Sequence, residues 1–419
     1  MAQTSDFSIA ALDRAGDGLT HEKEAIFGTL PGEIVRAHDE GSRWTVDEIM
    51  TPSRERVLPT CPQFGRCGGC ATQHIGPNLY RTWKRQLVVD ALARARIDAE
   101  VGALVDAHGA GRRRAIFHAR FAPDGVIDLG FMRRRSHEIV DIAACELLCP
   151  PLASAPSVAR EIARACASAG KPLDIQITST EGGLDIDVRG LGPPSADLAK
   201  ALMRRAESLD CARVSVHGQS LIERRAPALT IDGVTLVLPP GGFLQATQAG
   251  EAAIAKYALA PLKNAKRVAD LFSGCGAFAL RLAGKADVLA IDGDRAAIAS
   301  LSAAANHAKD RRVRVEIRDL FQRPLHGAEL DRLDGLVFDP PRAGAEAEAR
   351  ALAASTVPVV VAVSCSVDTF ARDARILLEG GYALESVTPI DQFLHSPHVE
   401  IVAAFRRAAA RRKTKGVLS

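Results

Sequence analysis

Three cysteines lie within ten residues, in Cys61-Pro-Gln-Phe-Gly-Arg-Cys67-Gly-Gly-Cys70. The paired glycines let this loop close tightly, so three thiolates can converge on one centre. A zinc site would pair the motif with a second cysteine or histidine pair, whereas only a single histidine, His74, follows closely and is interpreted as structural. Three thiolates with a fourth from far along the chain suit a [4Fe–4S] cluster, for which Cys145 and Cys149 are both candidates. Purely structural thiols are the third alternative.

A second constellation lies in Val268–Ala283, a pattern that predicts a buried strand, a glycine turn and an amphipathic helix. Gly274 and Gly276 let a ligand approach the backbone closely. The turn is not G-x-G-x-x-G, and Asp270 at the end of the strand would repel a phosphate. S-adenosylmethionine, with an amino group and a sulfonium, fits better, and Asp292 ends the next apolar run where a ribose hydroxyl is bound. An ordinary β-α-β turn without ligand is the alternative.

A further thiol, Cys365, follows the most apolar run of the chain, and Asp339 follows another apolar run in an Asp-Pro-Pro turn. Both should lie at the carboxyl edge of a sheet, where α/β proteins bind ligands. Beside a methyl donor, such a thiol can attack C6 of uracil and make C5 nucleophilic. A base must then remove the C5 proton, and Glu400 is a carboxylate late in the chain. The alternatives are an inert packed Cys365 and a carboxylate at the rim for Glu400.

Three patterns along the chain describe the elements that must position these residues. From about Phe243 onward, apolar strands alternate with alanine-rich helices, which predicts a doubly wound α/β domain. Residues 7–56 alternate in short runs broken by glycine and proline, typical of an OB-type β-barrel. Residues 102–242 predict an antiparallel sheet with a helix or two. The predicted fold class is therefore α/β, with a barrel at 1–57, an α+β domain at 58–242 and a nucleotide-binding domain at 243–419.

Residues Leu79–Ile97 predict an amphipathic helix. Its apolar face, which we expect to pack in a core, contains Leu79, Trp83, Leu87 and Leu92. Its basic residues point mostly away from that face, and we expect them to be exposed to solvent rather than to bind RNA. They are Arg81, Lys84, Arg85 and Arg94.

Basic residues cluster although the chain is nearly neutral, with 53 Lys and Arg against 50 Asp and Glu among 419 residues. Clustered guanidinium groups suit phosphate contacts, and a solvated face is the alternative for any one cluster. The clusters are Arg112–Arg114, Arg133–Arg135, Arg224-Arg225 and the tail from Arg406-Arg407 through Lys415. The chain begins without a basic and then apolar leader, and no apolar run is long enough to span a bilayer, which predicts a cytoplasmic protein. Nine cysteines in that reducing compartment argue for metal binding or catalysis rather than disulfides.

Taken together, these motifs resemble the RNA 5-methyluridine (uracil-C5) methyltransferase family. The resemblance is carried by Cys61…Cys67-Gly-Gly-Cys70, Phe243-Leu-Gln245, Asp270-Leu-Phe-Ser-Gly-Cys-Gly276, Asp339-Pro-Pro-Arg-Ala-Gly344, Ser364-Cys365 and His398-Val-Glu400. It runs from an N-terminal barrel similar to a TRAM domain, with Leu30-Pro-Gly-Glu33, to about Phe405. It implies the iron–sulfur branch of the family, which acts mainly on 23S rRNA, whereas the tRNA branch generally lacks the cluster.

The resemblance also implies roles for single residues. Cys365 would be the nucleophile and Glu400 the base. The cofactor would be bound by Gln245, Phe272, Asp292, Asp319 and Asp339. The cluster would be bound by Cys61, Cys67, Cys70 and Cys145, because the family's fourth ligand follows a basic stretch and an isoleucine-valine strand, here Arg133–Ile142. Asp319 as a turn cap is the alternative for that residue.

The sequence departs from the family pattern at three places. Ala277 stands where asparagine is common, Asp292 where glutamate is usual, and Ser366-Val367 where Asn-Pro often follows the nucleophile. The departures around Cys365 support one rival hypothesis, a non-catalytic RNA-binding or assembly factor. A second rival is an iron–sulfur oxidoreductase, which needs an electron partner and a flavin or nicotinamide site, and neither has a motif here. We expect RNA as the partner (23S rRNA first, tRNA as alternative), with no membrane contact and no obligate protein partner.

Overall fold

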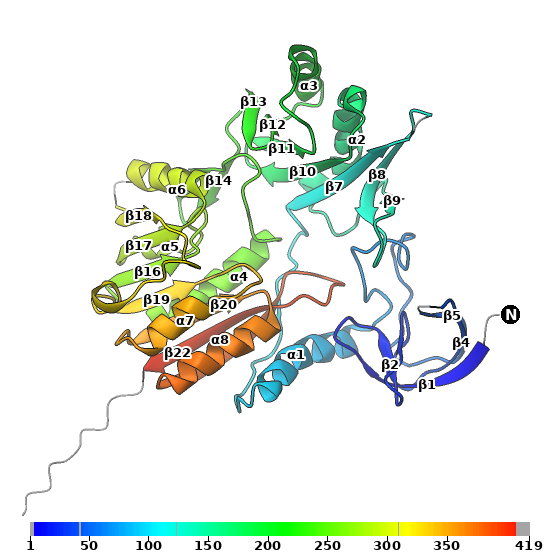
Figure 1. Cartoon of the computed structure of the whole chain (residues 1–419), viewed down its shortest axis with the longest axis horizontal. Helices are drawn as coiled ribbons and strands as arrows, with labels where there is room; N and C mark the ends of the chain where they lie inside the picture. Colours follow the sequence, from blue (N-terminus) through cyan, green and yellow to red (C-terminus); the bar gives the residue numbers. More distant parts are fainter. Residues whose placement is uncertain (1–3, 42, 123, 309, 408–419) are drawn as a thin grey trace, which may run out of the picture. The chain divides into compact units, whose positions relative to one another are not determined.

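A computed structural model of the chain describes residues 4–41, 43–122, 124–308 and 310–407 (Figure 1). The chain forms two compact units, each assembled from segments that are distant in sequence. The first contains Met1–Val89, Ala103–Ala253 and Ile390–Val399, and the second contains Asp90–Gly102, Ile254–Pro389 and the chain from Glu400. The three-domain division stays a prediction. No helix among the described residues is both long enough and apolar enough to cross a bilayer.

The first unit begins with a closed five-stranded barrel, as the N-terminal pattern predicts. Its strands are β1 (Thr4–Leu12), β2 (Gly18–Thr20), β3 (Ala25–Ile26), β4 (Ile34–Asp39) and β5 (Trp44–Thr51), in the order β1-β2-β3-β5-β4. Ile9, Ile26 and Val35 point inward and form its core. Buried Glu33 accepts two backbone N–H groups and pairs with Arg56 at 2.6 Å, which fixes the chain where it leaves the barrel.

Helix α1 (Pro77–Arg94) follows the cysteine motif and confirms the predicted helix. Trp83 packs in a buried cluster, and Arg81 is exposed, both as expected. The prediction for Lys84 was wrong, because its side chain is completely buried. The cause is a carboxylate 307 residues away in sequence, Asp391, whose Oδ1 lies 2.7 Å from the ammonium nitrogen. No pattern within the helix could reveal that partner.

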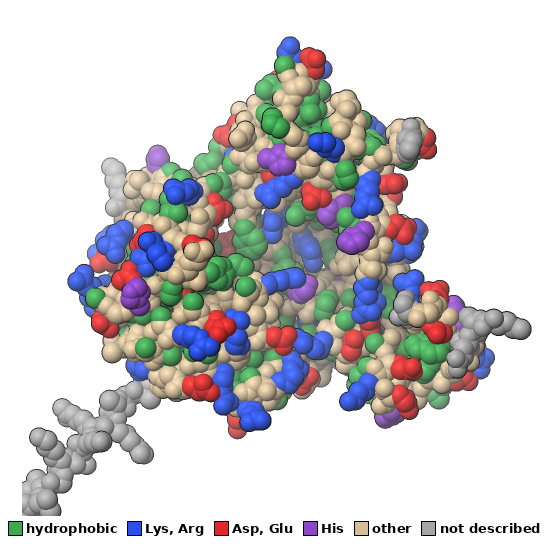
Figure 2. Space-filling view, in the orientation of Figure 1, with side chains coloured by type: hydrophobic (Ala, Val, Ile, Leu, Met, Phe, Trp, Pro, Cys, Tyr) green, Lys and Arg blue, Asp and Glu red, His purple; other side chains and the backbone are tan. Residues whose placement is uncertain are grey.

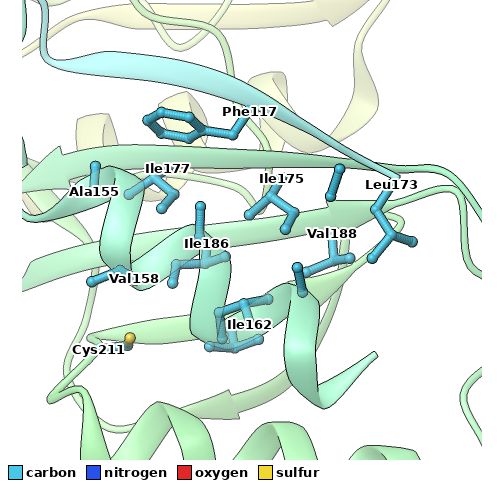
Figure 3. Close-up of a cluster of buried hydrophobic side chains, with 14 of the residues drawn as sticks. Phe117, Ala155, Val158, Ile162, Leu173, Ile175, Ile177, Ile186, Val188 and Cys211 are labelled. Atoms are coloured by element: carbon cyan, nitrogen blue, oxygen red, sulfur yellow. The ribbon is translucent and has the colours of Figure 1, made fainter. Parts of the chain in front are cut away.

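A seven-stranded sheet in the order β13-β12-β11-β10-β7-β8-β9 forms the rest of the first unit. Its strands are β7 (Arg114–Phe121), β8 (Ile127–Met132), β9 (Ile139–Asp141), β10 (Leu173–Thr180), β11 (Gly183–Arg189), β12 (Arg213–Val216) and β13 (Gln219–Glu223). Neighbours are antiparallel except β11 and β12, which are parallel and connected through α3 (Ala196–Ser208). Helix α2 (Ala155–Ala165) packs Val158 and Ile162 in one core with Ile175 and Ile186 of the sheet (Figure 3). A hairpin of β14 (Ala228–Ile231) and β15 (Val234–Val237) follows.

The second unit confirms the predicted doubly wound α/β fold. Its sheet has the order β18-β17-β16-β19-β20-β22-β21, and β6 (Val105–Asp106) pairs with the last two residues of β21. The strands are β16 (Arg267–Leu271), β17 (Asp287–Asp292), β18 (Val313–Ile317), β19 (Gly335–Phe338), β20 (Val359–Ser364), β21 (Tyr382–Asp391) and β22 (Glu400–Arg407). The helices are α4 (Gln248–Leu259), α5 (Ala279–Leu282), α6 (Arg295–His307), α7 (Glu346–Ala353) and α8 (Val367–Glu379). Strands β16 to β20 are parallel, and the strand order reverses between β16 and β19, where such folds bind ligands.

Candidate active site

The predicted nucleophile and base lie opposite each other on neighbouring strands. The antiparallel register of β20 and β22 pairs Ser364 with Ile401. The residue after Ser364 is Cys365 and the residue before Ile401 is Glu400, so the same register continues to place these two side by side. Cys365 is half-buried in the turn before α8, and Glu400 is buried. The structure therefore brings a thiol and a carboxylate together at the carboxyl end of β20.

The surroundings of Cys365 keep its thiol protonated. Burial raises the pKa of Cys365 to about 11, and the negative charges of Glu400 and Asp339 add to the increase. The nearby guanidinium of Arg342, which sequence reasoning missed, acts in the opposite direction. Because a thiolate is the stronger nucleophile, this thiol must lose its proton as it attacks rather than beforehand.

Carboxylates gather at the ends of β16, β17 and β19. Asp270 is completely buried, and burial followed by the charges of Asp339 and Asp292 raises its pKa well above the usual range. One Asp270 oxygen accepts the N–H of Ala279 at 2.8 Å, and Oδ1 has no hydrogen-bond partner among the described residues. An acidic edge with an unsatisfied buried oxygen favours a cationic ligand and disfavours a phosphate.

The glycine turn after β16 is held by backbone conformation and by one carboxylate. Gly274 (φ +51°) and Gly276 (φ +89°) are both left-handed. A Cβ on Gly276 would lie 2.3 Å from a methyl group of Leu301, whereas one on Gly274 would meet no atom within 4 Å. Asp292 accepts the N–H of Gly274 at 2.8 Å and so fixes the turn. The helix expected after the turn extends only over Ala279–Leu282.

Phe272 and Asp319 lie in the loops after β16 and β18. Phe272 has a φ of +58°, which is unusual for a residue other than glycine, and its ring centroid lies 5.4 Å from that of Phe321. Asp319 accepts the N–H of Phe321 at 3.0 Å, the geometry of a turn cap, so the alternative role for Asp319 has structural support. Phe321 is 50% exposed, and a lone aromatic in a loop gives no sequence signal.

The four cysteines of the predicted cluster line a single cavity of about 810 Å³ in the first unit, together with Arg112, Arg114 and Phe393. The cysteine loop reaches this cavity through backbone pairing of Cys67 with Arg133, directly after β8. At Gly68 there is no room for a side chain, because a Cβ would lie 2.9 Å from the carbonyl oxygen of Met132. Burial first, and then the other cysteines of the set, raise the pKa of the Cys70 thiol to about 11.

The two candidates for the fourth cysteine are separated in this arrangement. Cys145 packs against Cys67 and lines the cavity, whereas Cys149 is buried in the core between α2 and the sheet. Among the described residues, no group of three or more His, Cys, Asp or Glu side chains is arranged to hold a metal ion. The four thiols thus share a cavity without forming a site for one ion.

Most of the arginine clusters are engaged in ion pairs within the protein, and on the face shown in Figure 2 positive and negative side chains are interspersed. Arg134 and Arg135 pair with buried Asp17 of the barrel at 2.6 and 3.1 Å. Arg224 and Arg225 share Asp210. Neither of the two interpretations, a solvated face or a phosphate contact, describes these arginines fully, because they form ion pairs that connect segments of the protein. Residues 408–415 of the basic tail lie outside the described residues.

In the Arg112–Arg114 cluster, two guanidinium groups lie against aromatic rings. Arg112 lies 5.7 Å from the ring centroid of Phe393, and Arg114 lies 5.0 Å from that of Phe243, which is 64% exposed. Such arginine–aromatic pairs can stack on bases. The run Arg112–Arg114 was the only indication of these contacts in the sequence. Its middle residue, Arg113, is buried in the structure. Gln245, the remaining predicted cofactor residue, is in the first unit and accepts Gln392 Nε2 at 2.6 Å.

Comparison with known proteins gives matches over nearly the whole chain, although no family model matches it. An uncharacterized RNA methyltransferase of Brucella suis is 43% identical over 410 residues, covering 97% of this chain and 99% of the relative. The 23S rRNA (uracil(1939)-C(5))-methyltransferase RlmD of Halomonas elongata is 32% identical, covering 97% of this chain and 90% of the relative. The chain belongs to the RNA methyltransferase family.

A solved structure shows that this RNA methyltransferase shares the whole fold of another member. The tRNA (uracil-54, C5)-methyltransferase of Pyrococcus abyssi, in complex with S-adenosyl-L-homocysteine, matches with a TM-score of 0.73 and 21% identity, covering 96% of this chain and 100% of that one. The likeness at this identity concerns the fold. It includes the N-terminal barrel as well as the doubly wound sheet of the methyltransferase.

Proposed function

We propose that the protein is an S-adenosylmethionine-dependent RNA uracil-C5 methyltransferase that forms 5-methyluridine through a covalent adduct. The observation that carries the proposal is the register of β20 and β22, which sets Cys365 beside Glu400 at the acidic edge of the sheet. A thiol and a base are the two groups that methylation of an unactivated pyrimidine carbon requires. A non-catalytic RNA-binding factor would have no need of this pair.

Each chemical step assigns a task to this pair. Cys365 gives its proton to solvent water as its sulfur forms a bond to C6 of the uracil, and the C5=C6 electron pair moves toward C5 and O4. S-adenosylmethionine, when bound, supplies an electrophilic methyl group that C5 takes up. Glu400 then removes the C5 proton, the C5–H electrons restore the double bond, and the C6–S electrons return to Cys365. The base must leave its stack for the thiol to approach C6 from above the ring.

The residues present fit S-adenosylmethionine. The carboxylates of Asp292 and Asp339 beside buried Asp270 favour its positive charges, and the open space over Gly274 allows close approach. We propose that Phe272, Asp292, Asp319 and Asp339 bind it, and we assign Gln245 from its motif alone. Asp292 already holds the glycine turn, so its short side chain would serve the turn and the ribose together.

The substrate proposed first is a uridine in 23S rRNA, because the relative at 32% identity is RlmD, a 23S rRNA methyltransferase. A tRNA uridine is the alternative, and the tRNA enzyme of similar fold is too distant in sequence to favour it. The Arg112–Phe393 pair, which lines the cavity, and the Arg114–Phe243 pair would contact bases and phosphates of the RNA.

For the cavity itself we propose a [4Fe–4S] cluster bound by Cys61, Cys67, Cys70 and Cys145. A donor set of four sulfur atoms selects zinc or iron–sulfur centres, and three cysteines in one loop with a fourth from far along the chain favour the cluster. When bound, such a cluster would join the cysteine loop to the segment after β9 and stabilise the first unit. Anaerobic removal of iron should lower the thermal stability of the protein, and an unchanged melting curve would contradict this role.

The proposal is tested with RNA containing 5-fluorouridine, whose C5 fluorine blocks the final elimination and traps the adduct. The wild-type protein should form an adduct that is stable on denaturing gels, and Cys365→Ala should form none while binding RNA normally. With ordinary RNA, Glu400→Gln should accumulate a methylated adduct, since attack proceeds and proton removal does not. A Glu400→Gln protein with normal turnover would exclude Glu400 as the base. Mapping 5-methyluridine in RNA from cells with and without the gene would identify the substrate.

A further inference from the structure

Lys84 and Asp391, in the first unit, form a buried ion pair that has no part in the chemistry above. Both side chains have no exposed surface, and Lys84 Nζ lies 2.7 Å from Asp391 Oδ1. The ammonium group also donates to the carbonyl oxygens of Phe393, at 3.2 Å, and His398. Its three N–H bonds therefore all have acceptors within the segment 391–398. Removing two charges from water is costly unless they are satisfied in this way.

Asp391 receives donors from several elements. Its carboxylate accepts Tyr80 OH at 2.7 Å, His108 Nε2 at 2.9 Å and the Phe393 N–H at 3.0 Å, in addition to Lys84. Burial acts to raise the pKa of Asp391, but hydrogen bonds from His108 and Lys84 lower it to about 2. The carboxylate is therefore charged throughout the physiological range and holds the start of the segment in one conformation.

The segment Asp391–Val399, which we call the 391–399 loop, is anchored at other points too. His395 O accepts the N–H of Ala71 at 2.7 Å, and Ala71 directly follows Cys70. His395 N–H donates to Tyr80 OH at 3.2 Å, and Gln392 contacts Gln245 as described above. The loop thus touches α1, the cysteine motif and the Phe243-Leu-Gln245 motif within one unit. Its next residue along the chain is Glu400.

We propose that the Lys84–Asp391 pair is a positioning device that fixes the 391–399 loop and thereby aims Glu400 for proton removal from C5. The inference rests on the proposed function. His398, held by Lys84, is two residues before Glu400, so the loop sets where β22 begins. Cys365 directly follows β20 and lies outside the loop. Loosening the loop should therefore slow proton removal and expulsion of the Cys365 thiol, while leaving bond formation between sulfur and C6 largely intact.

The test compares two rates in the full-length, cluster-loaded protein. The rate of attack is measured as the rate of adduct formation with 5-fluorouridine RNA. Elimination is followed with ordinary RNA through the steady-state amount of methylated adduct, which rises when elimination is slower. Asp391→Asn, which removes the charge and keeps the shape, should raise the adduct by about tenfold while changing the attack rate by less than about threefold. Tyr80→Phe removes one hydrogen bond to Asp391 and should also raise the amount of adduct, but by less than Asp391→Asn.

The matched control is Asp185→Asn, which breaks the buried Arg213–Asp185 pair of the central sheet without touching the loop. Attack and elimination that slow in equal proportion in Asp391→Asn, or an equal adduct increase in the control, would overturn the inference. Hydrogen exchange adds a readout independent of activity: amides of Phe393 and His395 should exchange faster in Asp391→Asn, and unchanged exchange would also overturn it. A wild-type protein that forms no adduct with 5-fluorouridine RNA would instead overturn the proposed function, and this inference with it.

Discussion

The protonated state of Cys365 gives a direct chemical prediction for the protein without RNA. With a pKa of about 11 in the folded state against 9.0 for an ordinary thiol, the thiolate fraction at pH 8 falls from about one in ten to about one in a thousand. A more basic thiolate is more nucleophilic, which recovers about eightfold over two pKa units. Alkylation of folded Cys365 by iodoacetamide at pH 8 should therefore be about tenfold slower than in the urea-unfolded chain.

The assay follows the alkylated Cys365 peptide by mass spectrometry from pH 7 to 10. Between pH 9 and 10 the rate should rise nearly tenfold in the folded protein, whereas in the unfolded chain it should rise by about twofold at most and level off above pH 10. Glu400→Gln removes a neighbouring negative charge and should raise the folded-state rate at pH 8. Glu385→Gln, on neighbouring β21 and paired with Arg406, is the control and should leave it unchanged. A folded-state rate that is already constant at pH 8 would refute the electrostatic reasoning.

Two stability predictions concern the first unit. Burial lowers the pKa of His74 from 6.5 to about 4. Its contribution to the free energy of unfolding is therefore complete above pH 6.5. That contribution is lost as the pH falls toward 4, because only the unfolded chain binds a proton at His74 in this range. In urea titrations at several pH values, His74→Leu should remove up to about 3 kcal/mol of this loss of stability in acid, whereas the exposed control His21→Leu should not. An unchanged dependence of the unfolding free energy on pH in His74→Leu would contradict the assignment. The ring of Phe117 is fully buried and stacks on that of Phe131. Phe117→Ala should therefore lower the free energy of unfolding by about 3–5 kcal/mol. Ile116→Ala, on the exposed face of the same strand, should lower it by less than about 0.5 kcal/mol. Equal effects of the two substitutions would mean that this core does not carry the stability of the sheet.

The positions of Asp339 and Cys365 were predictable because each follows an apolar strand, and parallel strands end at a common edge. The position of Glu400 beside Cys365 was not, because it depends on β22 inserting antiparallel between β20 and β21. That order is a property of the assembled sheet and leaves no local pattern. The glycine turn and the helix after it were predicted correctly, but the apolar run did not define where the helix begins and ends.

The limits of local patterns are clearest where partners are distant in sequence. Helix α1 was predicted, but burial of Lys84 was not, because its acceptor is 307 residues away. The spacing of the cysteines left Cys145 and Cys149 both open, and only the path of the chain after β9 places Cys145 in the cavity and Cys149 in the core. Arginine runs indicated phosphate contacts, whereas Arg134 and Arg135 pair with an aspartate of the barrel.

The insertion of β22 also constrains the order in which the protein can become competent. Strands β16 to β20 can pair with one another as a nascent chain emerges, but the partner of β20 on its free side is the last described strand to be synthesised. Until it docks, β20 presents an open edge and Cys365 has no carboxylate opposite. Assembly of this pair is thus a late event in folding, so under the proposed mechanism a chain without docked β22 would lack the base that releases the RNA adduct.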